Sequence, residues 1–88
     1  MISLFCIVLH VECWIATTNF HGFGGTPRDI DNVTECQAAC ISYRSCVAVD
    51  WDPTNTGSTC WILTSLEKRA TTGNVEFVHY ELKPRCRG

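Results

Sequence analysis

The alternation of apolar and polar positions along the chain predicts one short helix followed by extended segments. Four residues three or four positions apart fall on one helix face: Cys36, Ala39, Cys40 and Tyr43. Thr34 is the expected N-cap, and Gln37 three residues later completes a capping-box pattern. The helix is expected to span about ten residues and to end near Arg44.

The two segments that follow the helix have the composition of paired strands. Cys46–Trp51 is rich in β-formers and too apolar for an edge strand. Asp52–Ser58 contains Pro, Asn and Gly, which predicts a hairpin connection to a return strand at Thr59–Thr64.

The remaining segments are expected to be two loops and a third strand. Thr17–Val33 is punctuated by glycine and proline, and Glu67–Asn74 is polar, so both are interpreted as loops. Val75–Leu82 is the expected third strand. Its apolar residues change face between Phe77 and Val78, which indicates a bulge or burial on both sides.

The N-terminal segment is apolar from Ile2 to Leu9, which is too short for a membrane-spanning helix. It resembles the core of a signal peptide, although no Lys or Arg precedes it and no small-residue cleavage site follows. A truncated start or a buried strand are the alternatives. We therefore expect an N-terminal segment at 1–12, one domain at 13–86 and a tail at 87–88.

Composition places the chain among small disulfide-rich domains. Seven cysteines in 88 residues are unusual in the cytosol, where thiols stay reduced, and such a short chain buries little core without staples. The formal net charge of −2 predicts no nucleic-acid binding, and the hydrophobic content of 45% excludes general disorder. No membrane span is expected.

The cysteines allow a metal site or a reactive thiol, but neither is favoured. Cys36 and Cys40 form one close pair, whereas zinc sites usually have two, and His21 and His79 are isolated. A redox pair normally has two intervening residues, and Glu35 opposes a lowered pKa for the Cys36 thiol. A Cys–His nucleophile is not excluded by spacing, but no local signature supports it. The sequence predicts no enzyme, cofactor or metal.

Disulfide staples are the favoured interpretation. Cys36 and Cys40 share a helix face and should bond outward, because one helical turn gives poor disulfide geometry between them. Cys46 is within reach of Cys40, and Cys60 can meet Cys36 from the paired strand. This leaves one cysteine near each end, and the favoured pairs are Cys40–Cys46, Cys36–Cys60 and Cys13–Cys86. Taken singly, these loops contribute about 2, 3.5 and 4.5 kcal/mol in the chain-entropy model.

Two stretches, "TECQAACISYRSCVAVDW" (Thr34–Trp51) and "TCWIL" (Thr59–Leu63), resemble the PAN/apple domain family. The resemblance extends over Cys13–Cys86. It implies an α+β fold with one short helix on an antiparallel sheet of about five strands. It also implies the same three disulfides, the terminal one being typical of apple domains. Cys6 departs from the family pattern and would be an unpaired thiol or an intermolecular link.

The resemblance implies an extracellular, non-catalytic recognition module that binds a protein or carbohydrate, commonly as part of a larger multidomain protein. Asn32 begins a glycosylation sequon. Because the family includes heparin binders, a basic patch for a heparin-like glycan is expected if five residues adjoin: Lys68, Arg69, Lys83, Arg85 and Arg87. The alternatives are a structural spacer domain of a larger secreted protein or a Cys/His metal-binding protein.

Aromatic and acidic residues give two weaker candidates. Trp14, Trp51 and Trp61 could form a sugar-stacking platform, but aromatic residues beside disulfides are more often core. The acidic stretch from Asp50 to Asn55 lacks the spacing of an EF-hand and is interpreted as turn chemistry.

Overall fold

A computed structural model describes residues 13–72 and 76–86. The expectations for residues 1–12 and 87–88, with Cys6 and Arg87 among them, lie outside the described residues. The described chain forms a small α+β fold in which one α-helix packs on an antiparallel sheet.

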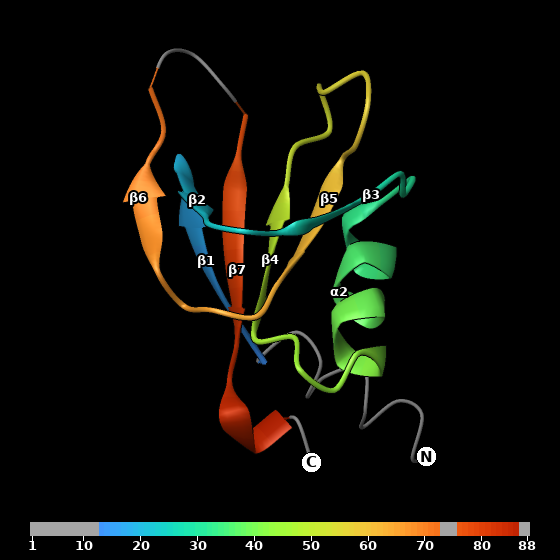
Figure 1. The fold of residues 1–88 in the computed structure, drawn as a ribbon, viewed down its shortest axis with the longest axis vertical. Coiled ribbons are helices and arrows are strands. Elements are labelled where there is room, and N and C mark those ends of the chain that lie inside the picture. Colours follow the sequence, from blue (N-terminus) through green and yellow to red (C-terminus); the bar gives the residue numbers. More distant parts are fainter. Residues whose placement is uncertain (1–12, 73–75, 87–88) are drawn as a thin grey trace.

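Figure 1 shows the element order along the chain. The elements are β1 (Trp14–Thr18), β2 (Phe20–Gly22), β3 (Thr26–Arg28), α2 (Val33–Ser42), β4 (Ala48–Trp51), β5 (Cys60–Leu63), β6 (Lys68–Ala70), β7 (Val78–Leu82) and the 3-10 helix η1 (Pro84–Cys86). Five strands form a sheet in the order β1-β7-β4-β5-β3, and β2 pairs with β6 in a separate ribbon. The five-stranded sheet and single helix agree with the expected fold class.

The helix begins two residues earlier than the sequence predicts. Asn32, not Thr34, is the N-cap, and its side chain accepts a hydrogen bond from the Glu35 backbone N at 2.9 Å. Glu35 also accepts a bond from Asn32 Nδ2 at 3.3 Å. Asn caps helices at least as well as Thr, and this choice makes Glu35 the third helical residue, so the reciprocal pair forms here instead. Tyr43 ends the helix and is 50% exposed rather than on the buried face.

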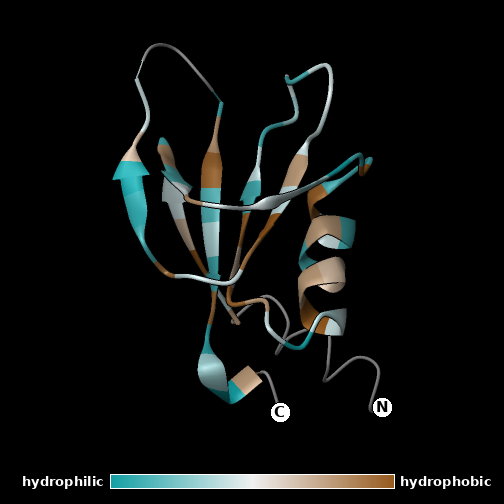
Figure 2. Ribbon diagram, in the orientation of Figure 1, coloured by the Kyte–Doolittle hydropathy of each residue, from teal (hydrophilic) through white to brown (hydrophobic). Residues whose placement is uncertain are grey.

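The hydrophobic core lies between α2 and one face of the sheet. The side chains of Val49, Ile62 and Leu82 lie on this face and pack with the buried cysteines of α2. Figure 2 shows the contrast with β6, whose first residues are strongly hydrophilic. The expectation that Cys46–Trp51 contains an inner strand is confirmed, because β4 lies between β7 and β5.

Three disulfides staple this core. They join Cys13 to Cys86, Cys36 to Cys60 and Cys40 to Cys46, with Cα atoms 5.8, 5.8 and 5.2 Å apart. These are the pairs that the sequence predicts. Two of them fasten α2 to β5 and to the segment before β4, and the third joins the two ends of the described domain.

The two segments interpreted as loops contain short strands, so that interpretation was wrong in part. Thr17–Val33 holds the end of β1 and all of β2 and β3, and Glu67–Asn74 holds β6. Strands of three residues give almost no periodic signal, and they exist because partner strands far along the chain supply their hydrogen bonds. Figure 1 shows the connection from β2 to β3 crossing β7 and β4 on one side of the sheet.

The sheet is buried on both faces at its centre. His79 and Tyr80 are neighbours on β7 and point to opposite faces. Tyr80 packs against the helix-side core, whereas His79 is fully buried on the other side, beneath the β2–β6 ribbon that contacts β7. Burial on both sides, rather than a bulge, therefore explains the change of face between Phe77 and Val78.

Candidate functional site

The cysteines of the described residues carry structure rather than chemistry. Cys36, Cys40, Cys46 and Cys60 are completely buried, and each is bonded in a disulfide. A sulfur bonded in a disulfide is not a thiolate, which is the form of cysteine that acts as a nucleophile or metal ligand. Within residues 13–72 and 76–86, no group of three or more His, Cys, Asp and Glu side chains is arranged to hold a metal ion.

The structure separates the basic residues into two groups. Lys68 and Arg69 lie on β6, whereas Lys83 follows the end of β7 and Arg85 lies within η1 (Figure 1). Arg87 lies outside the described residues. The four described basic residues therefore come from different segments, and the expected glycan patch stays a prediction.

The two basic residues of β6 are already engaged. Lys68 Nζ lies 2.8 Å from Glu81 Oε2, and the Arg69 guanidinium lies 5.6 Å from the ring centre of Phe23. Each contact uses part of the positive charge that a sulfated glycan would need.

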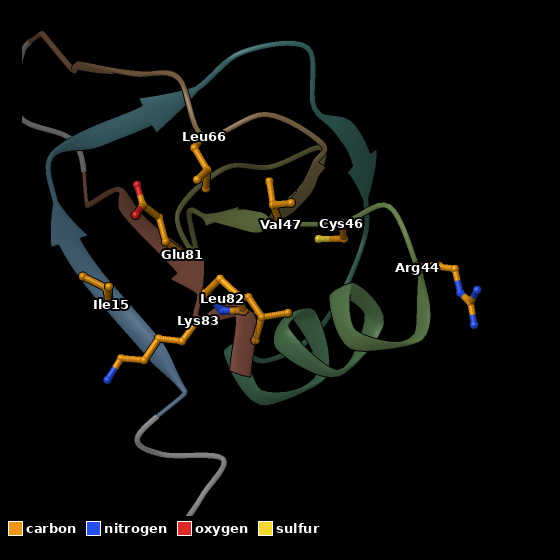
Figure 3. A pocket seen from close by; sticks show the side chains of 9 residues that line it. Ile15, Arg44, Cys46, Val47, Leu66, Glu81, Leu82 and Lys83 are labelled. Atoms are coloured by element: carbon orange, nitrogen blue, oxygen red, sulfur yellow. The ribbon is translucent and has the colours of Figure 1, made fainter. Parts of the chain in front are cut away.

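The C-terminal basic group borders an apolar groove of about 350 Å³, drawn in Figure 3. We call it the Ile15–Leu66 groove; Val47 and Leu82 also line it, and Lys83 and Arg44 stand at its margin. Ile15 and Leu66 are 49% and 53% exposed, which is high for such large apolar side chains. In Figure 3 the Arg44 side chain points away from the groove, so its charge is offered to solvent.

The tryptophans do not form one platform. Trp14 and Trp51 pack against the core on the helix side of the sheet. Trp61 follows the buried Cys60 on β5 and therefore points to the opposite face, where its ring stacks on Phe77 at 5.6 Å and 26°. Two of the three tryptophans are thus partly buried against the core, and Trp61 belongs to a different site.

That site is a pocket of about 370 Å³ on the sheet face away from the helix, which we call the Asp50 pocket. Its lining residues come from β2, the β2–β3 connection, β4, β5 and the segment before β7: His21, Gly22, Gly24, Gly25, Asp50, Trp61 and Phe77. The volume lies within the range of roughly 300–1,000 Å³ that is usual for ligand pockets.

Glycines let the β2–β3 connection lie directly on the sheet. A Cβ atom on Gly25 would stand 2.8 Å from Trp61 Cβ, and one on Gly22 would stand 2.6 Å from Leu63 Cδ1. Gly24 adopts a positive φ of 68°, which favours glycine. The rim of the pocket is therefore formed by glycine backbone that lies close to the side chains of β5.

Asp50 was interpreted as turn chemistry, and that interpretation was wrong. The residue is 3% exposed, and its carboxylate accepts the Gly22 backbone N–H at 2.7 Å and lies 2.7 Å from His79 Nδ1. Asp50 lies within β4, so its carboxylate is a buried anchor rather than a solvated turn group. The expected turn hydrogen bond is made two residues later, where Asp52 Oδ1 accepts from the Thr54 backbone N–H at 3.0 Å.

His79 links Asp50 to a second carboxylate. Its Nε2 lies 3.4 Å from Glu81 Oε2, which in turn pairs with Lys68. A series of polar side-chain contacts therefore runs from Asp50 on β4 through His79 and Glu81 on β7 to Lys68 on β6. The sequence signal for it was a polar residue inside each apolar strand, at Asp50 and His79, which sequence reasoning did not connect.

The sequon residue Asn32 is exposed, and its side-chain oxygen is occupied by the helix N-terminus. The Nδ2 atom, to which a glycan would attach, faces the exposed Glu35. Helix capping and glycosylation use different atoms of this side chain.

Comparison with known proteins gives no match to a family model, a curated protein or a solved structure. Among the described helices, none has the length and apolar content that crossing a membrane requires.

Proposed function

We propose that the chain is an extracellular, non-catalytic recognition module of the PAN/apple type that binds a protein or carbohydrate partner. The observation that carries the proposal is the pairing of all six described cysteines in three disulfides within one small domain. Such a framework persists in oxidising compartments and leaves these thiols without a chemical role.

The placement of the remaining polar groups supports binding rather than catalysis. Asp50 and His79, the buried titratable pair, contact each other, and Asp50 also accepts the backbone N–H of Gly22 at the end of β2. Disulfides to α2 hold Cys60 on β5, a strand that lines the Asp50 pocket, and Cys46, which lines the Ile15–Leu66 groove. Rigid elements that present loops and grooves are the usual form of small recognition domains.

The PAN/apple assignment is supported by the cysteine spacing around α2 and by the bridge between the domain ends. The helix on a five-stranded antiparallel sheet has the architecture that the resemblance implies. In such a module the partner is recognised by surface residues, and the disulfides act on stability.

Two measurements test the proposal. Mass spectrometry of the unreduced protein, produced in an oxidising compartment, should recover the Cys36–Cys60 and Cys40–Cys46 peptides as linked pairs. Free thiols at these four positions would contradict it. The folded protein should then retain a partner on a glycan array, a heparin column with a salt gradient, or a secreted-protein display library. Absence of binding on all three would favour a structural spacer instead.

A further inference from the structure

We propose that the Asp50 pocket binds one uncharged sugar residue of a glycan, with the ring on the Trp61–Phe77 pair and a hydroxyl on Asp50. This inference rests on the proposed function and names its ligand class. It places recognition on the face of the sheet opposite α2, away from the basic residues of η1.

The aromatic side of the pocket is preformed. The rings of Trp61 and Phe77 are stacked, and the His21 ring meets Phe77 edge-on at 6.3 Å and 71°. Trp61 and Phe77 are only partly buried, so they present aromatic surface to the pocket. The C–H groups on one face of a sugar ring carry partial positive charge and pack on the electron-rich face of an aromatic ring.

The polar side of the pocket suits a hydroxyl group. Each Asp50 oxygen already accepts one hydrogen bond, from the Gly22 N–H or from His79, and a carboxylate oxygen accepts two. One lone pair on each oxygen therefore remains for a donor. Gly24 adds no side chain to the rim, and the site where its Cβ would lie is open. The glycine backbone can approach a ring closely.

The charges around the pocket select an uncharged ligand. No Lys or Arg of the described residues lines it, and the Asp50 carboxylate would repel a sulfate or a uronic acid. A small ammonium would use the same two lone pairs, but it brings no ring face to pack on the Trp61–Phe77 pair and so would engage only the polar side of the pocket. A neutral ring with several hydroxyls meets both conditions.

The test is an NMR titration of the ¹⁵N-labelled, disulfide-bonded protein. The probes are the methyl glycosides of glucose, galactose, mannose and N-acetylglucosamine, with a heparin-derived disaccharide and methylamine as charged comparators. At least one neutral glycoside should shift the Trp61 indole N–H and the Gly24 and Gly25 amides together. The charged probes should leave these three signals unchanged.

Three variants locate the site. Asp50→Asn should weaken binding of the glycoside that causes the shifts about tenfold in Kd, since one acceptor oxygen is replaced by a donor NH2 group. Phe77 is less buried than Asp50, and Phe77→Leu keeps an apolar contact with Trp61. This variant should weaken glycoside binding about as much, and it tests the site if Asp50→Asn fails to fold. Phe23→Leu is the matched control: Phe23 lies in the same β2–β3 connection but does not line the pocket, and binding should stay within about twofold.

The outcomes separate this inference from the proposed function. Shifts confined to Lys68, Arg69, Lys83 or Arg85 with the heparin disaccharide would overturn the sugar pocket and leave the recognition module standing. The sugar pocket would also be overturned if no neutral glycoside shifted the Trp61, Gly24 and Gly25 signals, whether or not methylamine shifted the Trp61 signal. Free thiols in the unreduced protein would instead overturn the proposed function.

Discussion

His79 Nδ1 lies 2.7 Å from Asp50 Oδ1, and both residues are almost entirely shielded from solvent. They stand opposite each other in the register of β4 and β7. The second Asp50 oxygen accepts the Gly22 backbone N–H, so one carboxylate fastens the end of β2 to the centre of the sheet. Removing either member of a polar pair at this depth leaves the polar atoms of the other buried without that partner, which is costly.

Removing the Asp50 carboxylate should destabilise the domain strongly. In Asp50→Ala the Gly22 N–H and the His79 ring lose their partner while still buried, which should lower the free energy of unfolding by about 3 kcal/mol. Urea unfolding followed by circular dichroism measures the change. Asp52→Ala is the control, because Asp52 bonds only within an exposed turn, and it should cost less than about 1 kcal/mol. Equal losses in both variants would contradict the anchoring role.

The terminal disulfide should stabilise the domain more than the shortest one. Cys13–Cys86 spans 73 positions and Cys40–Cys46 only 6, so the chain-entropy model assigns them about 4.5 and 2 kcal/mol. The double variants Cys13→Ala/Cys86→Ala and Cys40→Ala/Cys46→Ala should rank accordingly in calorimetric melting temperature. The reverse order would show that packing lost around the completely buried Cys40 and Cys46 outweighs loop closure.

The sequence predicted those elements in which local pattern and tertiary structure agree. Cysteines one helical turn apart identified α2, and continuous β-formers around a turn identified the β4–β5 hairpin. The cysteine pairs followed from the same elements, because a shared helix face and a neighbouring strand leave few partners within reach.

The sequence could not predict elements that depend on distant partners. β2 and β6 are three residues long, and each is a strand only because the other supplies its hydrogen bonds. The Asp50 pocket has the same origin: Asp50, Trp61 and Phe77 lie on different elements, and only the folded sheet brings them together. The N-cap was misplaced because Asn32 and Thr34 are both good caps, and local sequence does not choose between them.

Asn32 should have separable roles in capping and in glycosylation. Asn32→Ala should lower the free energy of unfolding by about 1 kcal/mol, since the Glu35 N–H loses its acceptor at the helix start. Asn32→Asp keeps a capping oxygen and should cost much less. Both variants, and Thr34→Ala, should abolish the glycan mass shift when the protein is secreted from eukaryotic cells. A large loss of stability in Thr34→Ala would restore Thr34 as the cap.

Gly25 should not tolerate even a single added methyl group. The Cβ atom of Gly25→Ala would lie 2.8 Å from Trp61 Cβ and 2.9 Å from Leu63 Cδ2, so the β2–β3 connection must rise from the sheet. We expect a loss of about 1–3 kcal/mol in the free energy of unfolding, typical of overpacking. Gly57→Ala is the matched control, because nothing lies within 4 Å of its added Cβ, and it should be neutral or slightly stabilising. If Gly25→Ala unfolds at the same urea concentration as Gly57→Ala, the connection does not lie against β5 in solution, and the Asp50 pocket loses one of its walls.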